Sequence, residues 1–280
     1  MEKQKRVAAI HDISGFGKCS LTVALPVISA AGIETCPIPT AVLSAHTAVP
    51  GNFTCRDLTD DLGAFVNHWE ALKLKFDAVY SGYLGSKAQV DMVIDFINRF
   101  KTENTLVIVD PVMADDGKLY SLFDMDFVTE MRLLCKKADI IVPNMTEALL
   151  LLGREYKDGP YSKEFIADVM NELSSFAEKV VLTGVSLDEA HIGAAAFSKV
   201  TGKVEYFLSP CVPGIYHGSG DVLASSLTAA MVTGKSLEAA VSIAVKYTVD
   251  SINRTAEGLS DHNYGIDFEH GLIDFAKSLE

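Results

Sequence analysis

The feature that most constrains the fold of this chain is a repeated alternation of short apolar runs with longer stretches of helical periodicity. Within residues 90–100, apolar side chains recur every three or four positions, as on a helix that packs one face against a sheet. The alternation predicts a three-layer α/β fold, in which a mostly parallel sheet has helices on both faces, because parallel neighbours need a crossover between them. We interpret six runs as buried strands: residues 6–11, 35–43, 78–81, 106–109, 140–142 and 180–183.

A different pattern follows the sixth run. Residues 191–197 and 204–208 are two β-type segments joined by a short polar connection, which is typical of a hairpin and predicts an antiparallel edge of the sheet. After this hairpin the sequence is helical in character to its end. No internal repeat, low-complexity tract or linker divides the chain, so we predict a single domain over residues 1–280.

Charge limits the partners that the chain can attract. Its 24 basic and 37 acidic residues give a formal net charge of -13, which repels nucleic acid and anionic membrane surfaces, so we expect neither as a partner. An anionic nucleotide can still bind through local amides, a lysine or a metal ion. We therefore expect dependence on a divalent cation.

Cysteine usage and the N-terminus indicate the compartment. The five cysteines are scattered without a Cys-x-x-Cys pair, which argues against a disulfide framework and against a zinc site. The apolar run after the charged N-terminus is far shorter than a signal-peptide core, and no run reaches the roughly 18 apolar residues of a membrane helix. We expect a cytoplasmic protein.

Polar residues follow the predicted strands. In open α/β sheets, ligands bind at the carboxyl ends of the strands, so residues at these positions are candidates for a site. The alternative is that these residues are only the polar residues that loops at strand ends ordinarily carry. The candidates, in strand order, are Asp12, residues 44–47, Tyr83, Asp110, Asn144 and Thr183.

The most informative motif is His-Gly-Ser-Gly-Asp at residues 217–221, which directly precedes an apolar helical run. The glycines permit a tight turn, and the amides of Gly218, Ser219 and Gly220 with the start of the helix would bind an anion. Asp221 would then act as a base toward an alcohol that attacks phosphorus, which indicates phosphoryl transfer. The alternative is an ordinary loop with an aspartate near a helix N-cap.

A second glycine-containing segment spans residues 11–20. It fails as a phosphate loop, because Asp12 and Cys19 stand where a glycine and a serine or threonine are required, and Ser20 replaces the third glycine of a dinucleotide fingerprint. We interpret the segment as a turn from strand to helix that lets backbone approach a small substrate, with Asp12 as a hydrogen-bond acceptor. A plain tight turn is the alternative.

Two further segments place acidic groups at strand ends. Asp110 follows an apolar run and precedes Pro111, which stops the strand, and Asn144 precedes Glu147 by three residues, which puts both on one face of a helix. Such oxygen groups suit Mg2+ that is held partly through water and phosphate. The alternative for Asn144 and Glu147 is a capping box.

These motifs together resemble a known family. Asn-x-x-Glu at 144–147 and Gly-x-Gly-Asp at 218–221 resemble, in order and separation, the signatures of ribokinase-like small-molecule kinases. Residues 44–47, 81–86 and 110–113 are similar to the corresponding segments of pyridoxal kinases, which phosphorylate the 5'-hydroxymethyl group of B6 vitamins. The resemblance covers nearly the whole chain. It implies a homodimer and ATP and Mg2+ as cofactors, and leaves a monovalent cation such as K+ open.

The resemblance also assigns roles to the nucleotide side of the site. It implies that ATP contacts Asp110, Asn144 and Glu147, that Asp110 and Glu147 bind Mg2+, and that Thr183 and Gly184 border the triphosphate.

On the acceptor side, the resemblance implies that Asp12, His46, Thr47 and Tyr83 contact the vitamin ring and that Asp221 is the general base, next to the substrate. Residues 12–15 are more similar to hydroxymethylpyrimidine kinases of thiamin synthesis, as is His217. A pyrimidine kinase or an enzyme for both rings is therefore the alternative function, and a sensor that binds without turnover is an alternative of another class.

Overall fold

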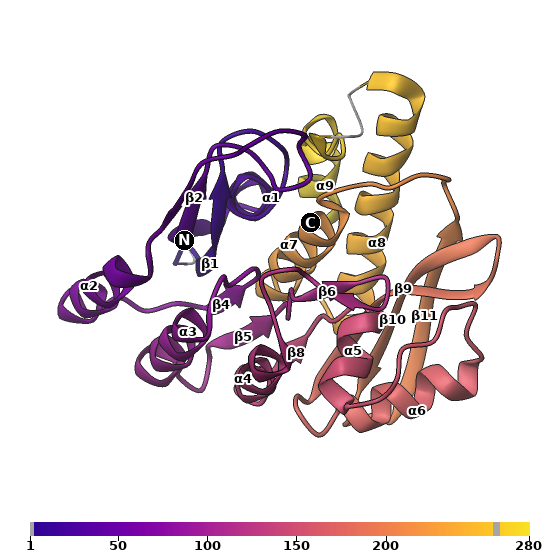
Figure 1. The fold of residues 1–280 in the computed structure, drawn as a ribbon, viewed down its shortest axis with the longest axis horizontal. Helices are drawn as coiled ribbons and strands as arrows, with labels where there is room; N and C mark the ends of the chain where they lie inside the picture. The colour runs from indigo at the N-terminus through magenta and orange to yellow at the C-terminus, as the bar shows by residue number, and fades with distance from the viewer. Residues whose placement is uncertain (1–2, 260–263) are drawn as a thin grey trace.

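The computed structural model describes residues 3–259 and 264–280, and a nine-stranded mixed sheet forms its centre (Figure 1). The strands of this sheet are β1 (Arg6–Ser14), β2 (Glu34–Leu43), β3 (Cys55–Asp57), β4 (Ala78–Ser81), β5 (Leu106–Val109), β8 (Ile140–Ile141), β9 (Lys179–Asp188), β10 (His191–Ser198) and β11 (Lys203–Pro210). Their order is β11-β10-β9-β8-β5-β4-β1-β2-β3. The pairs from β2 through β9 are parallel, whereas β3 and the β9-β10-β11 pairs are antiparallel.

Helices cover both faces of the sheet (Figure 1). One layer holds α2 (Thr59–Ala71), α3 (Lys87–Phe100), α4 (Met125–Cys135), α5 (Met145–Leu152) and α6 (Lys163–Leu173). The other holds α1 (Leu21–Ala30), α7 (Ser219–Val232), α8 (Leu237–Arg254) and α9 (Leu272–Ser278). Two short turns of helix, η1 (Thr255–Leu259) and η3 (Glu269–Gly271), flank the gap in the described residues.

The core lies in two parts because successive side chains of a strand point to opposite faces. In β1, Ala8 and Ile10 pack toward the layer of α2 to α6, whereas Val7 packs toward the layer of α1 and α7. All three are buried, as expected for a strand with helices on both sides. The first core also contains an aromatic group in which Phe96 stacks on Phe100 with ring centroids 4.4 Å apart.

The predicted α/β architecture and its antiparallel hairpin are confirmed, but several strands are longer than predicted, and in β1 and β9 this changes the position of a candidate site residue. β1 continues through Asp12 to Ser14, so Asp12 lies within the strand and not after it. β9 continues beyond Thr183, the last residue of the predicted strand, to Asp188, so Thr183 lies inside the strand and not at its end. Asp12 lies at an irregularity in the β1–β2 register, between the pairs His11–Pro39 and Ile13–Val42, and a count of apolar side chains does not detect that the strand continues past it. The helix predicted around residues 90–100 begins earlier, at Lys87.

Three short strands were not predicted. β3 consists of three exposed residues at the sheet edge, so its side chains carry no pattern of burial. β6 (Ala114–Asp115) and β7 (Lys118–Leu119) form a small separate hairpin whose turn contains Asp116 and Gly117, both at positive φ. Asp-Gly is a common sequence for such a two-residue turn. This hairpin lies between β5 and α4 in the chain.

Two broader expectations concern the whole chain. None of the helices in residues 3–259 and 264–280 is long and apolar enough to cross a membrane. The single domain over residues 1–280 stays a prediction, although strands from both halves of the chain share one sheet.

The starts of α1 and α7 meet at the edge of the sheet where the parallel strands end. Gly218, the N-cap of α7, has a φ of 77° and packs its backbone against the loop that leads into α1. A Cβ atom at Gly218 would lie 2.0 Å from the carbonyl oxygen of Lys18. Only glycine satisfies both the positive φ and the close approach.

We predict that Gly218→Ala lowers the free energy of unfolding by about 2–5 kcal/mol, because left-handed backbone strain adds to a collision with main chain. Gly234→Ala is the control: Gly234 also has a positive φ, 92°, but nothing lies within 4 Å of the point that a Cβ atom would occupy. It should lose only about 1–2 kcal/mol. Urea unfolding of both variants measures the difference, and equal losses would contradict the close contact at Lys18.

Candidate active site

Asp221 is the third residue of α7 and lies near the start of α1 and the end of β1. Its side chain is half-buried and is not turned out into bulk water. Burial raises the pKa of the Asp221 carboxyl to about 7, and the nearby Asp12 adds to the rise while the Ser20 amide opposes it. At neutral pH this carboxyl is poised between its two protonation states, as a general base should be.

The first turn of α7 presents amides without partners. Gly218 is the N-cap and contributes no side chain, and Ser219 N reaches Tyr216 O only at 3.4 Å. The amides of Gly220 and Asp221 have no acceptor among the described residues, as expected for the first turn of a helix. Gly220 is exposed and has open space beside it. These groups can bind an anion next to the Asp221 carboxylate.

Asp110 directly follows β5 and is 7% exposed. Its backbone amide donates to Ser81 O at 2.9 Å, but its carboxyl makes no hydrogen bond within the described ranges. Burial raises the pKa of Asp110 well above its usual range, and the charges of Glu147 and Asp221 raise it further. Three carboxyl groups therefore converge, and they repel one another when ionised.

Asn144 and Glu147 form the capping box that the sequence left open as an alternative. Asn144 Oδ1 accepts from Glu147 N and Glu147 Oε2 accepts from Asn144 N, both at 2.9 Å. Glu147 Oε1 also accepts from Met113 N at 3.0 Å, and Asn144 Nδ2 donates to Ala114 O at 2.8 Å. Burial raises the pKa of Glu147 to about 8 despite these amide donors. The motif fixes the start of α5 and the β6 hairpin together.

Thr183 and Gly184 lie beside Asn144, at a bulge in β9. Thr183 N donates to Pro143 O at 2.9 Å and pairs with Asn144 in a parallel bridge. The register of β9 against β10 shifts at this point, and Gly184 has a φ of 66° with open space at its Cβ position. The bulge ends the parallel pairing and exposes backbone next to Asn144.

Asp12 and Tyr83 face the same region from β1 and from the segment after β4. Asp12 is 5% exposed and accepts from Ser14 Oγ at 3.4 Å. Burial raises the pKa of the Asp12 carboxyl, and Ser20 only partly offsets this rise. Burial and the charge of Asp12 raise the pKa of Tyr83 to about 12, which keeps this phenol a hydrogen-bond donor at neutral pH.

His46 and Thr47 lie on the loop between β2 and β3. The loop is held by His46 N, which donates to Phe16 O at 2.8 Å, and by the close packing of Gly17 on His46. The His46 and His217 rings are 5.5 Å apart, and burial together with His217 lowers the pKa of His46. Thr47 is exposed and makes no hydrogen bond within the described ranges. The structure brings His46, but not Thr47, into contact with another segment of the site.

Sequence reasoning missed two residues that the structure places here. Tyr120 follows β7, and the charges of Glu147, Asp115, Asp110 and Asp221 add to burial in raising its pKa. The Asp-Gly turn of the β6 hairpin was the signal that could have located it. Ser20 adjoins both Asp12 and Asp221, and its local sequence carries no such signal.

Comparison with known proteins gives the family. Residues 58–265 match the family described as phosphomethylpyrimidine kinase. Pyridoxal kinase of Ovis aries is 29% identical over 256 residues, which cover 82% of this chain and 78% of that protein.

Two solved structures are similar over nearly the whole chain. A Bacteroides thetaiotaomicron protein described as a candidate phosphomethylpyrimidine kinase, in a crystal form with pyridoxal, has a TM-score of 0.92 and 37% identity and covers 98% of this chain and 96% of its own. Pyridoxal kinase from Lactobacillus plantarum has a TM-score of 0.90 and 30% identity and covers 98% of each chain. With its α/β fold, its Gly-x-Gly-Asp helix start and these similarities, the chain belongs to the phosphomethylpyrimidine kinase family, the ribokinase-like group that includes pyridoxal kinases.

Proposed function

We propose that this protein transfers the γ-phosphoryl group of ATP to the exocyclic hydroxymethyl group of pyridoxal, pyridoxine or pyridoxamine. The observation that carries the proposal is Asp221, whose pKa is raised to about 7, beside the unpartnered amides of its own helix start. The similarity to a structure crystallised with pyridoxal supports this acceptor.

In the proposed reaction, the acceptor hydroxyl gives its proton to the Asp221 carboxylate as its oxygen bonds to the γ-phosphorus. The bond from that phosphorus to the β-γ bridging oxygen breaks, and ADP leaves. The amides of Gly218, Ser219 and Gly220, with that of Asp221, stabilise negative charge on the transferring group. They are already fixed by the packing of Gly218, so they need no rearrangement when charge develops.

For the nucleotide, we propose contacts with Asn144, Thr183 and Gly184, which lie together at the β9 bulge. Asp110 and Glu147 would hold Mg2+, which supplies charge neutralisation at the phosphates when bound. Within the described residues, no three His, Cys, Asp or Glu side chains could hold a metal alone. That fits Mg2+, which usually takes only one or two protein carboxylates and completes its shell with water and phosphate oxygens.

For the acceptor ring, we propose contacts with Asp12, His46, Thr47 and Tyr83. His46 Nδ1 accepts from Ala48 N at 3.3 Å, which leaves Nε2 to carry the proton and to donate to a ligand. Asp12 is a buried acceptor and suits a ring N–H or hydroxyl donor. We also propose, on the family resemblance alone, a cytoplasmic homodimer.

A second candidate function is phosphorylation of hydroxymethylpyrimidine. The matching family carries a pyrimidine kinase description, and Asp12 and His217 resemble that branch. Both acceptors present a primary alcohol on a flat nitrogen heterocycle.

A coupled ATPase assay with pyridoxal, pyridoxine, pyridoxamine and hydroxymethylpyrimidine in parallel tests the proposal. We expect the highest kcat/KM with a B6 vitamer. A preference for the pyrimidine would favour the second candidate, and vitamer binding without ATP consumption would contradict the kinase proposal.

We predict that Asp221→Asn lowers kcat by about 10²- to 10⁴-fold, because a positioned base is lost, while ATP affinity changes little. In the unsubstituted enzyme, kcat/KM should fall as pH drops below about 7, where Asp221 becomes protonated. Steady-state kinetics across pH and nucleotide titration measure both effects. Full turnover in the variant would remove Asp221 from the mechanism.

We predict that Asp110→Asn stabilises the protein free of metal and nucleotide, and that its gain in Tm grows as pH rises. The folded-state pKa of Asp110 is raised, so its stabilising contribution is complete below its unfolded value near 3.8 and is lost as the carboxyl ionises above it. Asparagine removes that loss. The same variant should need more Mg2+ for half-maximal activity, and an unchanged Mg2+ requirement would refute the metal assignment.

A further inference from the structure

Lys18 lies in the loop between β1 and α1, and its main chain contacts two glycines from the last third of the chain. Its carbonyl oxygen lies 2.0 Å from the point that a Cβ atom of Gly218 would occupy, and 3.0 Å from the same point at Gly265. Both glycines have a positive φ, 77° and 120°. The Lys18 backbone therefore touches the start of α7 and also residues 264–271, which we call the C-terminal segment.

Three further contacts fix Lys18 to the C-terminal segment. Its amide donates to Tyr264 O at 2.8 Å, and its ammonium donates to Glu269 Oε2 at 2.8 Å. The ammonium also lies over the Phe268 ring, 5.9 Å from the ring centroid. Only 29% of the Lys18 side chain is exposed, so the ion pair is partly shielded from solvent. The backbone and the side chain of Lys18 thus hold the same segment.

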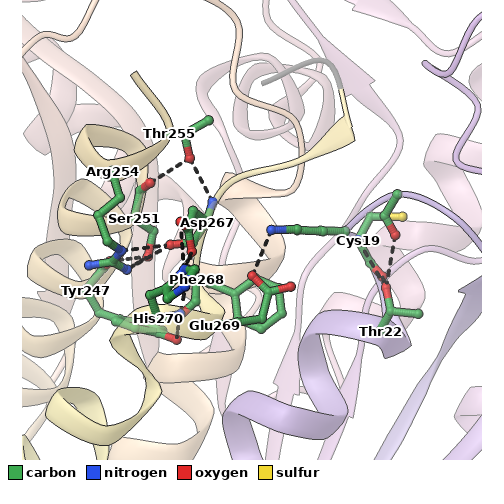
Figure 2. Close-up of polar contacts among 12 residues, drawn as sticks. Cys19, Thr22, Tyr247, Ser251, Arg254, Thr255, Asp267, Phe268, Glu269 and His270 are labelled. Carbon is green, nitrogen blue, oxygen red and sulfur yellow. Dashed lines mark hydrogen bonds and ion pairs between the residues drawn. The ribbon is translucent and has the colours of Figure 1, made fainter. Parts of the chain in front are cut away.

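The C-terminal segment is itself fixed to the end of α8 (Figure 2). Arg254 Nη2 donates to Asp267 O at 2.8 Å, and Tyr247 OH donates to Phe268 O at 2.8 Å. Asp267 N donates to Thr255 Oγ1 at 2.7 Å. Because these hydrogen bonds are buried or half-buried and connected with one another, the segment can serve as a fixed support for the loop before α1.

The ion pair of Lys18 differs from two other lysine ion pairs of this protein. Lys246 pairs with Asp250 within α8, and Lys277 pairs with Asp274 within α9. Each of these pairs restrains only its own helix. The pair of Lys18 joins residues 251 positions apart in the sequence, and the backbone of the same lysine contacts the start of a third element, α7.

We propose that Lys18 is a positioning residue for phosphoryl transfer: its ion pair with Glu269 holds its carbonyl against Gly218 and thereby fixes the amides in the first turn of α7. The inference rests on the proposed function, in which these amides stabilise the transferring group. Lys18 acts through Gly218 and not on the reacting atoms. A small displacement of this turn would misalign the donors and slow the chemical step.

The competing role for a lysine near such a turn is direct binding of phosphate. The two roles predict different effects of Glu269. If the Lys18 ammonium bound phosphate, Glu269 would compete for it, and removal of the Glu269 charge would leave ATP binding equal or tighter. If Lys18 acts through its carbonyl, Glu269 supports the site, and removal of its charge slows turnover.

The kinetic test compares Lys18→Met and Glu269→Gln with Lys246→Met, a control that removes the ammonium of the ion pair within α8. The first two variants should each lower kcat about tenfold, with a smaller change in the KM for ATP, because the amides act mainly on the transition state. Lys246→Met should change neither. An unchanged kcat in Glu269→Gln, or a loss confined to the KM for ATP, would overturn the proposal.

Stability and charge exchange provide two further readouts. All three variants should keep their Tm within about 3 °C of the unsubstituted protein, because partly exposed ion pairs contribute little to stability. Lys18→Glu should lower kcat more than Lys18→Met, since two carboxylates then face each other. Combining Lys18→Glu with Glu269→Lys should recover most of that loss. A double variant no more active than Lys18→Glu would contradict the role of the pair.

A measurement on the ligand-free protein separates this inference from the proposed function. In amide NMR spectra, the resonances of Gly218, Ser219 and Gly220 should shift in Lys18→Met and in Glu269→Gln, and stay in place in Lys246→Met. Unmoved resonances in the first two variants would overturn the role of Lys18 even in an active kinase. If no acceptor is phosphorylated at all, the proposed function fails, while these shifts still decide whether Lys18 positions the turn.

Discussion

The site depends on one main-chain contact between segments two hundred residues apart in the sequence: the backbone of Gly218 against the carbonyl of Lys18. This contact sets the start of α7 beside the start of α1, so the positive ends of two helices face one small region. Asp221 lies at this junction, and the Ser20 amide across from it favours its ionised form. A residue larger than glycine at position 218 would push the starts of α1 and α7 apart, and Asp221 would no longer lie between them.

The positive helix ends at this junction lie in a region that is otherwise strongly acidic. The chain carries a net charge of -13, and Asp110, Glu147 and Asp221 lie close together where burial already disfavours their ionised forms. The Glu147 carboxylate accepts hydrogen bonds from two backbone amides, whereas no group within the described ranges donates a hydrogen bond to the Asp110 carboxyl. The two carboxyl groups therefore differ in their surroundings: the Glu147 carboxylate holds backbone in place, whereas the Asp110 carboxyl has no such partner, although both are proposed to bind Mg2+.

Much of the fold could be predicted from the sequence because the buried strands and their crossover helices leave periodic patterns. The ends of strands were predicted less well, since β1 continues past the irregularity at Asp12 and β9 continues past the bulge at Gly184, where the pattern of apolar side chains is interrupted. Asn144 and Glu147 were recognised because their interaction is local, three residues apart. The position of Ser20 could not be recognised, because Lys18 in the loop before it is held by Tyr264, Gly265 and Glu269, which lie more than 200 residues away in the sequence.

The composition of the second helical layer has a consequence for synthesis. This layer combines α1 from the beginning of the chain with α7, α8 and α9 from its last third, whereas the opposite layer, α2 to α6, is continuous in sequence. As the chain leaves the ribosome, one face of the sheet can therefore be covered early. On the other face, Val7, Tyr80 and Ile108 remain exposed until α7 and α8 have been synthesised. The nascent chain therefore exposes an apolar surface until α7, α8 and α9 have emerged, and until then it most needs protection from association.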